Sequence, residues 1–333
     1  MSRILVTGGA GFIGSAMVRL LLAHDHSVRV LDKLTYAAGE NWENLAGLNV
    51  ELVRGDICSF GDCQTAMIGM DAVLHFAAES HVTRSENDPE LFGKVNVGGT
   101  LNLLEAAFRA SVERFLHIST DEVYGPTASG YFKEEARLAP TSPYASSKAS
   151  ADIRAQEWKD KIPGLVIARP TNNFGPRQHP EKAFPRWITH LLSGQKIPVW
   201  GEGRQVRDWL YAEDCCWAIR MLLEAHVSGV YNIGANNLPE ITNLQMAKLL
   251  VRICGLGEDY IELVRDPRPD HDFRYGVNTD RIRDLLGWKP SWSLESAVTQ
   301  TVEWYKQNES WWRKRVKDAE ALYAGKEKPT PRR

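Results

Sequence analysis

The chain has 333 residues, of which 43% are hydrophobic and 25% are charged, and its formal net charge at pH 7 is −2. This is the composition of an ordinary globular protein, long enough for one large domain or for two interlocked ones. The balanced charge, without a long block of like sign, argues against nucleic acid and membrane surfaces as partners.

The cysteines and histidines argue against a disulfide framework and against a metal site. The five cysteines form no Cys-x-x-Cys pair, and their odd number suits a reducing compartment, so we expect buried free thiols. The nine histidines show no His-x-x-x-His spacing. No apolar run reaches the roughly 18 residues that could cross a bilayer, and glycines interrupt the first apolar run at once, so a signal peptide is not expected. We therefore expect a cytoplasmic protein without a metal.

The N-terminal segment combines a short apolar strand, a glycine-rich turn and a helix. The strand is predicted at residues 3–7, and the helix runs from the turn through Leu22. Gly9, Gly11 and Gly14 have the spacing of a dinucleotide-binding turn, in which glycines let the backbone approach a pyrophosphate and leave helix N–H groups free to bind it. Taken alone, the pattern is equally compatible with a turn that serves packing only.

The second strand, residues 27–31, ends at an acidic residue. Asp32 lies 18 residues after Gly14, where a carboxylate can accept hydrogen bonds from both hydroxyls of an adenosine ribose. It would repel a 2′-phosphate, so the sequence predicts NAD rather than NADP. The alternative role, as the N-cap of a helix, fits a position at a strand end less well.

Strands and helices continue to alternate after this point. Strands are predicted at 50–53, 72–76 and 115–118, and apolar periodicity predicts a helix over 96–110. This alternation predicts an α/β fold with a doubly wound parallel sheet, whose ligands bind at the carboxyl ends of the strands.

From about residue 170 the chain changes character. Prolines recur around a helix predicted over 184–193, which favours an inserted substrate region. The segment that begins at Trp209 is expected to return to the first domain as a strand and a helix, followed by a strand at 229–234. Helices broken by prolines are expected over 240–312, and the last ten residues are expected to fray.

Two motifs place reactive side chains near the end of the strand 115–118. Thr120, Asp121 and Glu122 supply a hydroxyl and two carboxylates, and Tyr144 and Lys148 would project from the same face of a helix, one turn apart. An acid, a base and a tuned phenol around one pocket suggest elimination of water, made possible by a nicotinamide redox step. Each motif also has a structural interpretation, an acidic helix N-terminus for the carboxylates and a packing aromatic for Tyr144.

Taken together, these motifs resemble those of the nucleotide-sugar 4,6-dehydratases, most closely the dTDP-glucose 4,6-dehydratases, in the extended short-chain dehydrogenase/reductase superfamily. The resemblance runs from Thr7 to about Trp312. Its most specific parts are Thr-Asp-Glu-Val-Tyr-Gly at 120–125 and Glu-Ser-His-Val at 79–82. It implies an NAD-dependent hydro-lyase, and its family precedent is a homodimer packed through helices that begin near residues 96 and 143.

The resemblance and the pattern together divide the chain into two domains. We expect an NAD-binding Rossmann domain at 1–171, with a return segment at about 207–232. A smaller, discontinuous C-terminal α/β domain at 172–206 and 233–320 would bind the nucleotide sugar, and 324–333 would be a flexible tail.

The resemblance also implies a mechanism. Lys148 would lower the pKa of Tyr144, whose phenolate takes the proton of the sugar C4 hydroxyl while hydride passes to NAD. Thr120 would bind the C4 oxygen. Glu122 would then remove the C5 proton, which the C4 ketone acidifies, while a protonated Asp121 donates to the departing C6 hydroxyl. Hydride returns to C6, so NAD is regenerated in each turnover and stays bound.

Further contacts follow from the resemblance, residue by residue. Cofactor contacts are implied for Gly8, Gly11, Phe12, Ile13, Gly14, Asp32, Lys33, Thr35, Asp56, Ile57, Phe76, Ala77, Ala78, Ser80, Tyr144, Lys148 and Asn173. Nucleotide and sugar contacts are implied for Ser80, Thr120, Asn172, Lys182, Ala183, Pro198, Trp200, Arg207, Asn243, Arg268 and His271. For Lys182 and Arg268, a solvated surface cation is an equally good interpretation.

Three alternatives stay open at this point. The chain departs from the family pattern at several positions expected to line the base and diphosphate region, among them Thr83, Thr171 and Trp200, so uridine could replace thymidine in the substrate. A nucleotide-sugar epimerase would need only Tyr144, Lys148 and NAD. A non-catalytic NAD-binding sensor would need neither side chain.

Overall fold

Seven parallel strands form the central sheet of the protein, whose computed structural model describes residues 2–39, 41–266 and 272–324. The strand order is β11-β6-β5-β4-β1-β2-β3. The strands are β1 (Arg3–Thr7), β2 (Ser27–Asp32), β3 (Glu51–Arg54), β4 (Ala72–His75), β5 (Arg114–Ile118), β6 (Gly164–Pro170) and β11 (Gly229–Ile233). The order reverses between β1 and β4, which confirms the predicted doubly wound Rossmann sheet and places its ligand crevice at that reversal.

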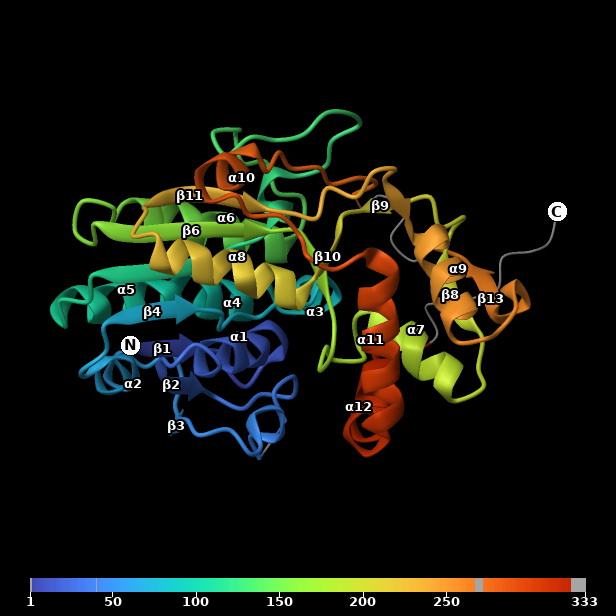
Figure 1. The fold of residues 1–333 in the computed structure, drawn as a ribbon, viewed down its shortest axis with the longest axis horizontal. Coiled ribbons are helices and arrows are strands. Elements are labelled where there is room, and N and C mark those ends of the chain that lie inside the picture. The colour runs from blue at the N-terminus through green and yellow to red at the C-terminus, as the bar shows by residue number, and fades with distance from the viewer. Residues whose placement is uncertain (1, 40, 267–271, 325–333) are drawn as a thin grey trace.

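Helices cover both faces of this sheet (Figure 1). One face carries α1 (Phe12–Leu22) and α8 (Ala212–Glu224), and the other carries α2 (Phe60–Met67), α5 (Thr100–Arg109) and α6 (Pro143–Gln156). Both faces of the strands are therefore buried, as expected of a parallel sheet.

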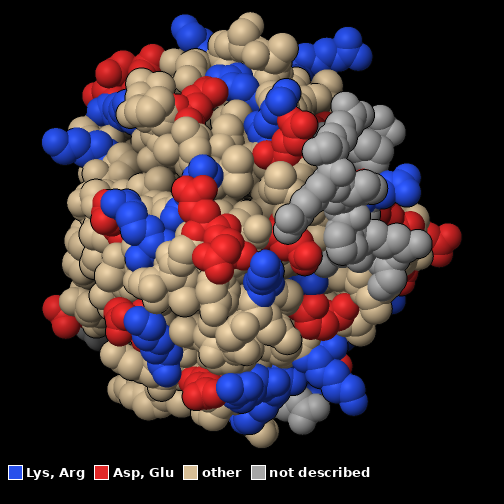
Figure 2. Space-filling view, turned by 90° about the vertical axis from the view of Figure 1, so that its right-hand side faces the viewer, with Lys and Arg blue, Asp and Glu red and all other residues tan. Residues whose placement is uncertain are grey.

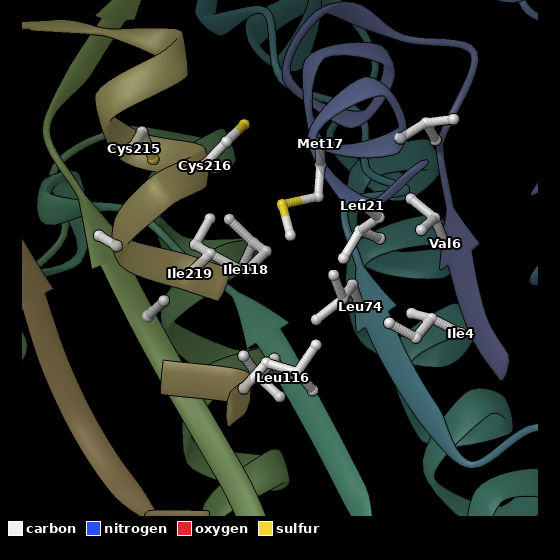
Figure 3. Packing of buried hydrophobic residues seen from close by; sticks show 14 of the residues in the cluster. Ile4, Val6, Met17, Leu21, Leu74, Leu116, Ile118, Cys215, Cys216 and Ile219 are labelled. Atoms are coloured by element: carbon white, nitrogen blue, oxygen red, sulfur yellow. The ribbon is translucent and has the colours of Figure 1, made fainter. Parts of the chain in front are cut away.

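The packing on the α1 and α8 face is apolar and continuous. Figure 3 shows Met17 and Leu21 of α1 on one side and Ile219 of α8 on the other, above Leu74 and Leu116 of the strands. All five side chains are fully buried. This core fixes α1, and with it the glycine turn, against the end of β1.

The predicted helix over 96–110 begins earlier and differently from the prediction. Two short helices, α3 (Val82–Asn87) and α4 (Pro89–Phe92), lead into a wider π-helical segment, η2 (Gly93–Gly99), before α5 starts at Thr100. Asn96 explains why this segment is held in place: its amide donates to the Glu79 carbonyl at 2.9 Å and to Ser147 Oγ at 2.8 Å. Segment η2 is thereby tied to the loop after β4 and to α6.

A second lobe lies beyond one end of the sheet and has its own core (Figure 1). Its helices are α7 (Ala183–Leu192), α9 (Asn243–Ile253), α11 (Leu294–Gln307) and α12 (Glu309–Ala321). Two small sheets join them, parallel β8 (Ile197–Trp200) with β13 (Ile261–Val264), and antiparallel β9 (Val206–Arg207) with β12 (Ile241–Thr242). Elsewhere in the molecule the chain also forms helix α10 (Asp280–Leu286) and three short 3₁₀ turns. These turns are η1 (Glu43–Leu45), η3 (Asp121–Tyr124) and η4 (Glu258–Tyr260).

The segment predicted to return to the sheet does so only in part. Strand β10 (Trp209–Tyr211) pairs with β7 (Asn172–Phe174) in a separate two-stranded sheet, so the expected strand does not join the central one. Helix α8 and β11, which follow it, do lie against and within the central sheet. The β7–β10 pair thus forms the connection between the two cores.

Two expectations about individual residues need correction or fall outside this description. All five cysteines are free, but only Cys63, Cys215 and Cys216 are buried. Cys58 and Cys254 are half-buried because each lies in a turn at the protein surface, next to α2 and just after α9. Of the tail predicted at 324–333, all but the first residue lies outside the described residues.

The described residues include no helix long and apolar enough to span a membrane, and no group of three or more His, Cys, Asp or Glu side chains that could hold a metal ion. Acidic and basic side chains both occur across the face of the molecule shown in Figure 2.

Candidate active site

A cavity of about 360 Å³ follows the carboxyl ends of the parallel strands. Every residue predicted to contact the cofactor lines it, from Gly8 and the glycine turn through Asp32, Asp56 and Ser80 to Asn173. So do four of the five predicted catalytic residues, Thr120, Glu122, Tyr144 and Lys148. The structure thus brings both predicted groups into one space.

The glycine turn is shaped by close contacts that a side chain would block. Gly8 has a φ of +68°, and a Cβ there would lie 2.6 Å from the Ala77 nitrogen. A Cβ on Gly14 would lie 2.2 Å from the Gly8 carbonyl oxygen. Helix α1 then starts at Phe12 without a side-chain cap and without an acidic residue in its first turn. Its first N–H groups, which lack intrahelical partners, are therefore available to a pyrophosphate.

Asp32 is held rigidly at the end of β2. Its two carboxylate oxygens accept from the Ala10 nitrogen at 3.0 Å and from the Leu34 nitrogen at 2.8 Å. Burial raises the pKa of Asp32, and these two hydrogen bonds oppose that rise. No helix begins at this residue, so the N-cap interpretation is wrong, and the carboxylate lines the cavity where a ribose is expected.

The residues after β5 form a short 3₁₀ turn that separates the two carboxylates. Thr120 is the N-cap of η3, and its hydroxyl accepts from the Glu122 nitrogen at 3.3 Å. Glu122 lines the cavity, whereas Asp121 is buried behind it, with its Oδ1 accepting from the Thr120 hydroxyl at 3.2 Å. Asp121 and Glu122 thus do lie in the first turn of a short helix, as the structural interpretation expected, but Glu122 also lines the cavity.

Asp121 has the electrostatic character that an acid requires. Burial is the main cause that raises its pKa well above the ordinary value, and the charges of Glu122 and of Asp208 raise it further. A neutral, protonated Asp121 was expected from the sequence for the first two of these reasons. Asp208 was not foreseen, and it is itself fixed by the Asn236 and Asn237 nitrogens at 3.1 and 3.2 Å.

Tyr144 and Lys148 lie one turn apart on α6, whose start is fixed by Ser142 and Pro143. The Ser142 hydroxyl accepts from the Ala145 nitrogen at 3.1 Å, and Pro143 occupies the first turn, where its missing N–H costs nothing. The Tyr144 nitrogen also donates to Ser85 Oγ at 3.1 Å. The backbone position of Tyr144 is therefore fixed by contacts that do not involve its hydroxyl.

The expected pKa shift of Tyr144 is wrong for the protein alone. Burial and the charge of Glu122 raise the pKa of Tyr144, and a hydrogen bond with Thr120 only partly opposes this. Lys148 does not lower it, because its Nζ donates to the Ile118 carbonyl at 2.6 Å and burial lowers its own pKa to about 8. Burial of the Tyr144 phenol thus has a larger effect on its pKa than the attraction to the Lys148 ammonium on which the prediction was based.

The lowered pKa of Lys148 leads to a stability prediction. The unfolded chain holds this proton more tightly than the folded one, so the buried ammonium destabilises the protein below pH 8. Lys148→Met should therefore stabilise cofactor-free protein at pH 7 by on the order of 1–2 kcal/mol, the roughly 3 kcal/mol of that pKa shift less about 1 kcal/mol for the lost bond to Ile118. Denaturant titration should show that the difference in free energy of unfolding between Lys148→Met and the wild type shrinks as the pH rises from about 8 toward 10.5. A difference that stays constant with pH would contradict this prediction.

The substrate contacts implied by the resemblance divide into three groups. Ser80, Thr120, Asn172 and Lys182 line the same cavity, and Lys182 Nζ donates to the Ser80 carbonyl at 2.6 Å. Outside its lining lie Ala183, Pro198, Trp200, Arg207 and Asn243. Arg268 and His271 lie outside the described residues.

Arg207 makes its contacts with the protein itself. Its guanidinium donates to the carbonyls of Val206 at 2.7 Å and Asp272 at 2.8 Å, and it lies over the Tyr275 ring at 4.8 Å. Tyr275 was missed by the sequence reasoning. Burial raises its pKa, and the charge of Glu122 is the next cause, so this ring lies near the predicted base. No spacing rule could have found it, since the two residues are far apart in the chain.

A buried ion pair supports α6 from below. Arg169 on β6 donates to both carboxylate oxygens of Asp152 at 2.8 and 2.9 Å, and to Tyr124 Oη at 2.6 Å. Asp152 lies one turn after Lys148 and is the charge that partly restores its pKa. Tyr124 is buried and takes part in this network beneath the site.

Comparisons with known proteins agree with this geometry. Residues 4–234 match the model of the NAD dependent epimerase/dehydratase family. The chain is 46% identical, over 93% of its length and 94% of the relative's, to a dTDP-glucose 4,6-dehydratase of Streptomyces niveus. It superimposes with a TM-score of 0.88 on a dTDP-glucose 4,6-dehydratase of Streptomyces venezuelae solved with NAD bound, at 41% identity, covering 94% of this chain and 99% of that one.

The fold alone does not separate the two activities of that family. A UDP-glucose 4-epimerase of Thermus thermophilus, solved in complex with NAD, matches with a TM-score of 0.84 at 30% identity, covering 92% of this chain and 99% of that one. The higher identity to dehydratases and the match over most of both chains agree with the resemblance found in the motifs. The chain belongs to the NAD dependent epimerase/dehydratase family.

Proposed function

We propose that the chain is an NAD-dependent nucleotide-sugar 4,6-dehydratase, with dTDP-glucose as the best candidate substrate. The single observation that carries the proposal is that Tyr144, Lys148 and Glu122 line one cavity next to Asp121, a buried carboxyl with a raised pKa. Glu122 would be the base, and burial raises the pKa of the neighbouring Asp121 well above its ordinary value, which suits an acid. A redox step alone needs only the first pair, whereas elimination of water needs a base and an acid as well.

The residues that would hold NAD fit that cofactor. The glycine turn leaves the first N–H groups of α1 for the pyrophosphate, and Asp32 would bind the adenosine ribose. When bound there, NAD would supply a hydride acceptor for C4, the hydride donor for C6 and a positive charge that favours a phenolate beside it.

The side chains of this protein carry the protons. With NAD bound, Tyr144 would accept the proton of the C4 hydroxyl. The protein alone raises the pKa of this phenol, so the positive charge of the nicotinamide has to offset that rise. Thr120 binds the C4 oxygen. Glu122 removes the C5 proton, and Asp121 protonates the C6 hydroxyl, which leaves as water when its bond to carbon breaks. Glu122 then returns a proton, exchanged with solvent, to C5. The turnover is complete once Tyr144 has released the C4 hydroxyl proton and Asp121 has regained a proton from solvent. The product is a 4-keto-6-deoxy nucleotide sugar.

Incubation with dTDP-glucose and, separately, UDP-glucose tests the proposal. Mass spectrometry should show a product lighter by one water for the preferred nucleotide, NMR should show a 4-keto group, and no net NADH should accumulate. In deuterated water, deuterium should enter the sugar at C5. A 4-epimer of unchanged mass would instead favour the epimerase.

The alternatives are each less well supported. An epimerase would leave without a task both Glu122 and Asp121, whose pKa is raised, and a non-catalytic sensor would leave Tyr144 and Lys148 without one. We further propose that the nucleotide sugar is bound by Ser80, Asn172 and Lys182 at the cavity and by residues of the second lobe. These include Ala183, Pro198, Trp200, Arg207, Asn243, Arg268 and His271.

We also propose the division of the chain into an NAD-binding domain at 1–171 with its return segment at about 207–232, and a sugar-binding domain at 172–206 and 233–320. Separate cores in the two lobes support two domains, but Trp209 and Tyr211 of the return segment pack in the second core, and Ile282 and Trp288 pack in the first. Five free cysteines support a reducing compartment, the cytoplasm, and family precedent supports a homodimer.

A further inference from the structure

Three side chains from distant segments meet at the rim of the cavity. Glu181 Oε1 accepts from the Tyr36 hydroxyl at 3.0 Å, and Glu181 Oε2 accepts from Arg84 Nε at 2.9 Å. The Arg84 guanidinium lies over the Tyr36 ring at 3.9 Å from its centroid. Each member therefore contacts both others, and we call Tyr36, Arg84 and Glu181 the rim triad.

The triad joins the loops that border the cavity. Tyr36 follows Thr35 in the loop after β2, Arg84 lies in α3 after the loop that carries Ser80, and Glu181 precedes Lys182 just before α7. Thr35, Ser80 and Lys182 all line the cavity, as does Glu181 itself. The contacts of the triad thus connect these three segments to one another at the cavity, on the side where Asp32 would bind the adenosine ribose.

Three more side chains contact Glu181 or Tyr36, one of them from the C-terminal end of the described chain. The Glu181 carbonyl accepts from the Tyr323 hydroxyl at 2.5 Å, and His81 Nε2 lies 3.2 Å from that carbonyl. His179 packs edge-on against the Tyr36 ring, with centroids 5.4 Å apart. Residues that follow β2, β4 and α12 therefore all meet on Glu181.

The energetics favour a closed rim. The Glu181 side chain is only 2% exposed, so separating it from its partners would leave a buried carboxylate without its ion pair. Such a loss is costly, and bonds to ionised groups are about twice as strong as neutral ones. A dinucleotide that enters or leaves past these loops would have to break the contacts of the triad first.

We propose that the rim triad is a latch, which keeps the cavity closed over bound NAD and so retains the cofactor from one turnover to the next. The inference rests on the proposed function, in which NAD is regenerated within each turnover and does not have to be released. The three residues act on the cofactor through the loops they join, and none of them is assigned a catalytic step.

The test measures cofactor release rather than activity. Holoenzyme is loaded with radiolabelled NAD and chased with excess unlabelled NAD, and the label that stays on the protein is followed after rapid desalting. Tyr36→Phe keeps the ring under Arg84 and removes one hydrogen bond, so release should become about 3- to 10-fold faster. Glu181→Gln removes the ion pair with Arg84, and release should become about 100-fold faster.

The chain offers a matched control in a second triad of the same composition. The Tyr131 hydroxyl donates to Glu240 Oε1 at 3.0 Å, Arg274 Nε donates to Glu240 Oε2 at 2.9 Å, and the Arg274 guanidinium lies over the Tyr131 ring at 5.0 Å. None of these three lines the cavity. Tyr131→Phe should leave NAD release unchanged, and a Tyr131→Phe effect as large as that of Tyr36→Phe would overturn the proposal.

The outcome is separable from that of the proposed function. Release that stays at the wild-type rate in Tyr36→Phe and in Glu181→Gln, both folded by their thermal unfolding, overturns the latch even if the chain dehydrates dTDP-glucose. Faster release in both variants supports the latch even if no tested nucleotide sugar is dehydrated. Should Glu181→Gln fail to fold, Tyr36→Phe decides alone, because its single missing hydroxyl leaves the buried ion pair intact.

Discussion

Replacing Glu122 with glutamine should lower the rate of dehydration by about 10²- to 10⁴-fold while leaving C4 oxidation in place. Glutamine has nearly the same shape but cannot take the C5 proton. Glu122 also raises the pKa of Tyr144, so removing its charge should not hinder formation of the phenolate. Under single-turnover conditions the variant should accumulate NADH, detected by its absorbance. In the wild-type protein this NADH does not accumulate, because its hydride is returned to the sugar.

Asp121→Asn is the matched comparison for this variant. Because burial raises the pKa of Asp121 and so disfavours its charge, a neutral asparagine suits the same position, and its amide can still contact the Thr120 hydroxyl. The fold should therefore tolerate it, while the loss of the donated proton should lower dehydration by about 10- to 100-fold. Dehydration at the wild-type rate in Glu122→Gln would contradict the role of Glu122 as the base. A 4-epimer formed at the wild-type rate by this variant would instead favour the epimerase.

Tyr144→Phe should stop the reaction before any hydride is transferred, with kcat reduced by about 10³-fold or more. The variant loses the hydrogen bond of the Tyr144 hydroxyl with Thr120 but keeps the Ser85 hydrogen bond to its nitrogen and the edge-on packing with Phe92, whose ring centroid is 6.4 Å away, so the protein should remain folded. Thermal unfolding checks this, and NAD binding should be retained because the glycine turn and Asp32 are untouched.

A combination of variants orders the two steps. If oxidation precedes elimination, Glu122→Gln combined with Tyr144→Phe should show no NADH in a single turnover, like Tyr144→Phe alone. NADH that still accumulates in the double variant would mean that another group accepts the C4 proton. The neighbouring candidate is then Tyr275, since it lies near Glu122 and its pKa is also raised by that charge.

Local patterns in the sequence were sufficient for the parts of the site that a few adjacent residues determine. Glycine spacing predicted the turn at the end of β1, because only glycine fits where a Cβ would meet the Ala77 or Gly8 backbone. The spacing of Tyr144 and Lys148 predicted a shared helix face, and strand–helix alternation predicted the sheet. These features depend on the backbone geometry of single elements, which sequence encodes directly.

Only the tertiary structure decided what depends on burial and on contacts between distant segments. It reversed the expected shift of Tyr144, since no local pattern reveals how completely the phenol is desolvated or that Lys148 binds the Ile118 carbonyl. It paired β10 with β7 instead of the central sheet. It also joined Tyr36 to Glu181, 145 residues later, in a cluster that no motif announced. The free energies of such contacts arise from excluding water around groups that the chain order keeps apart, so they appear only once the chain has folded.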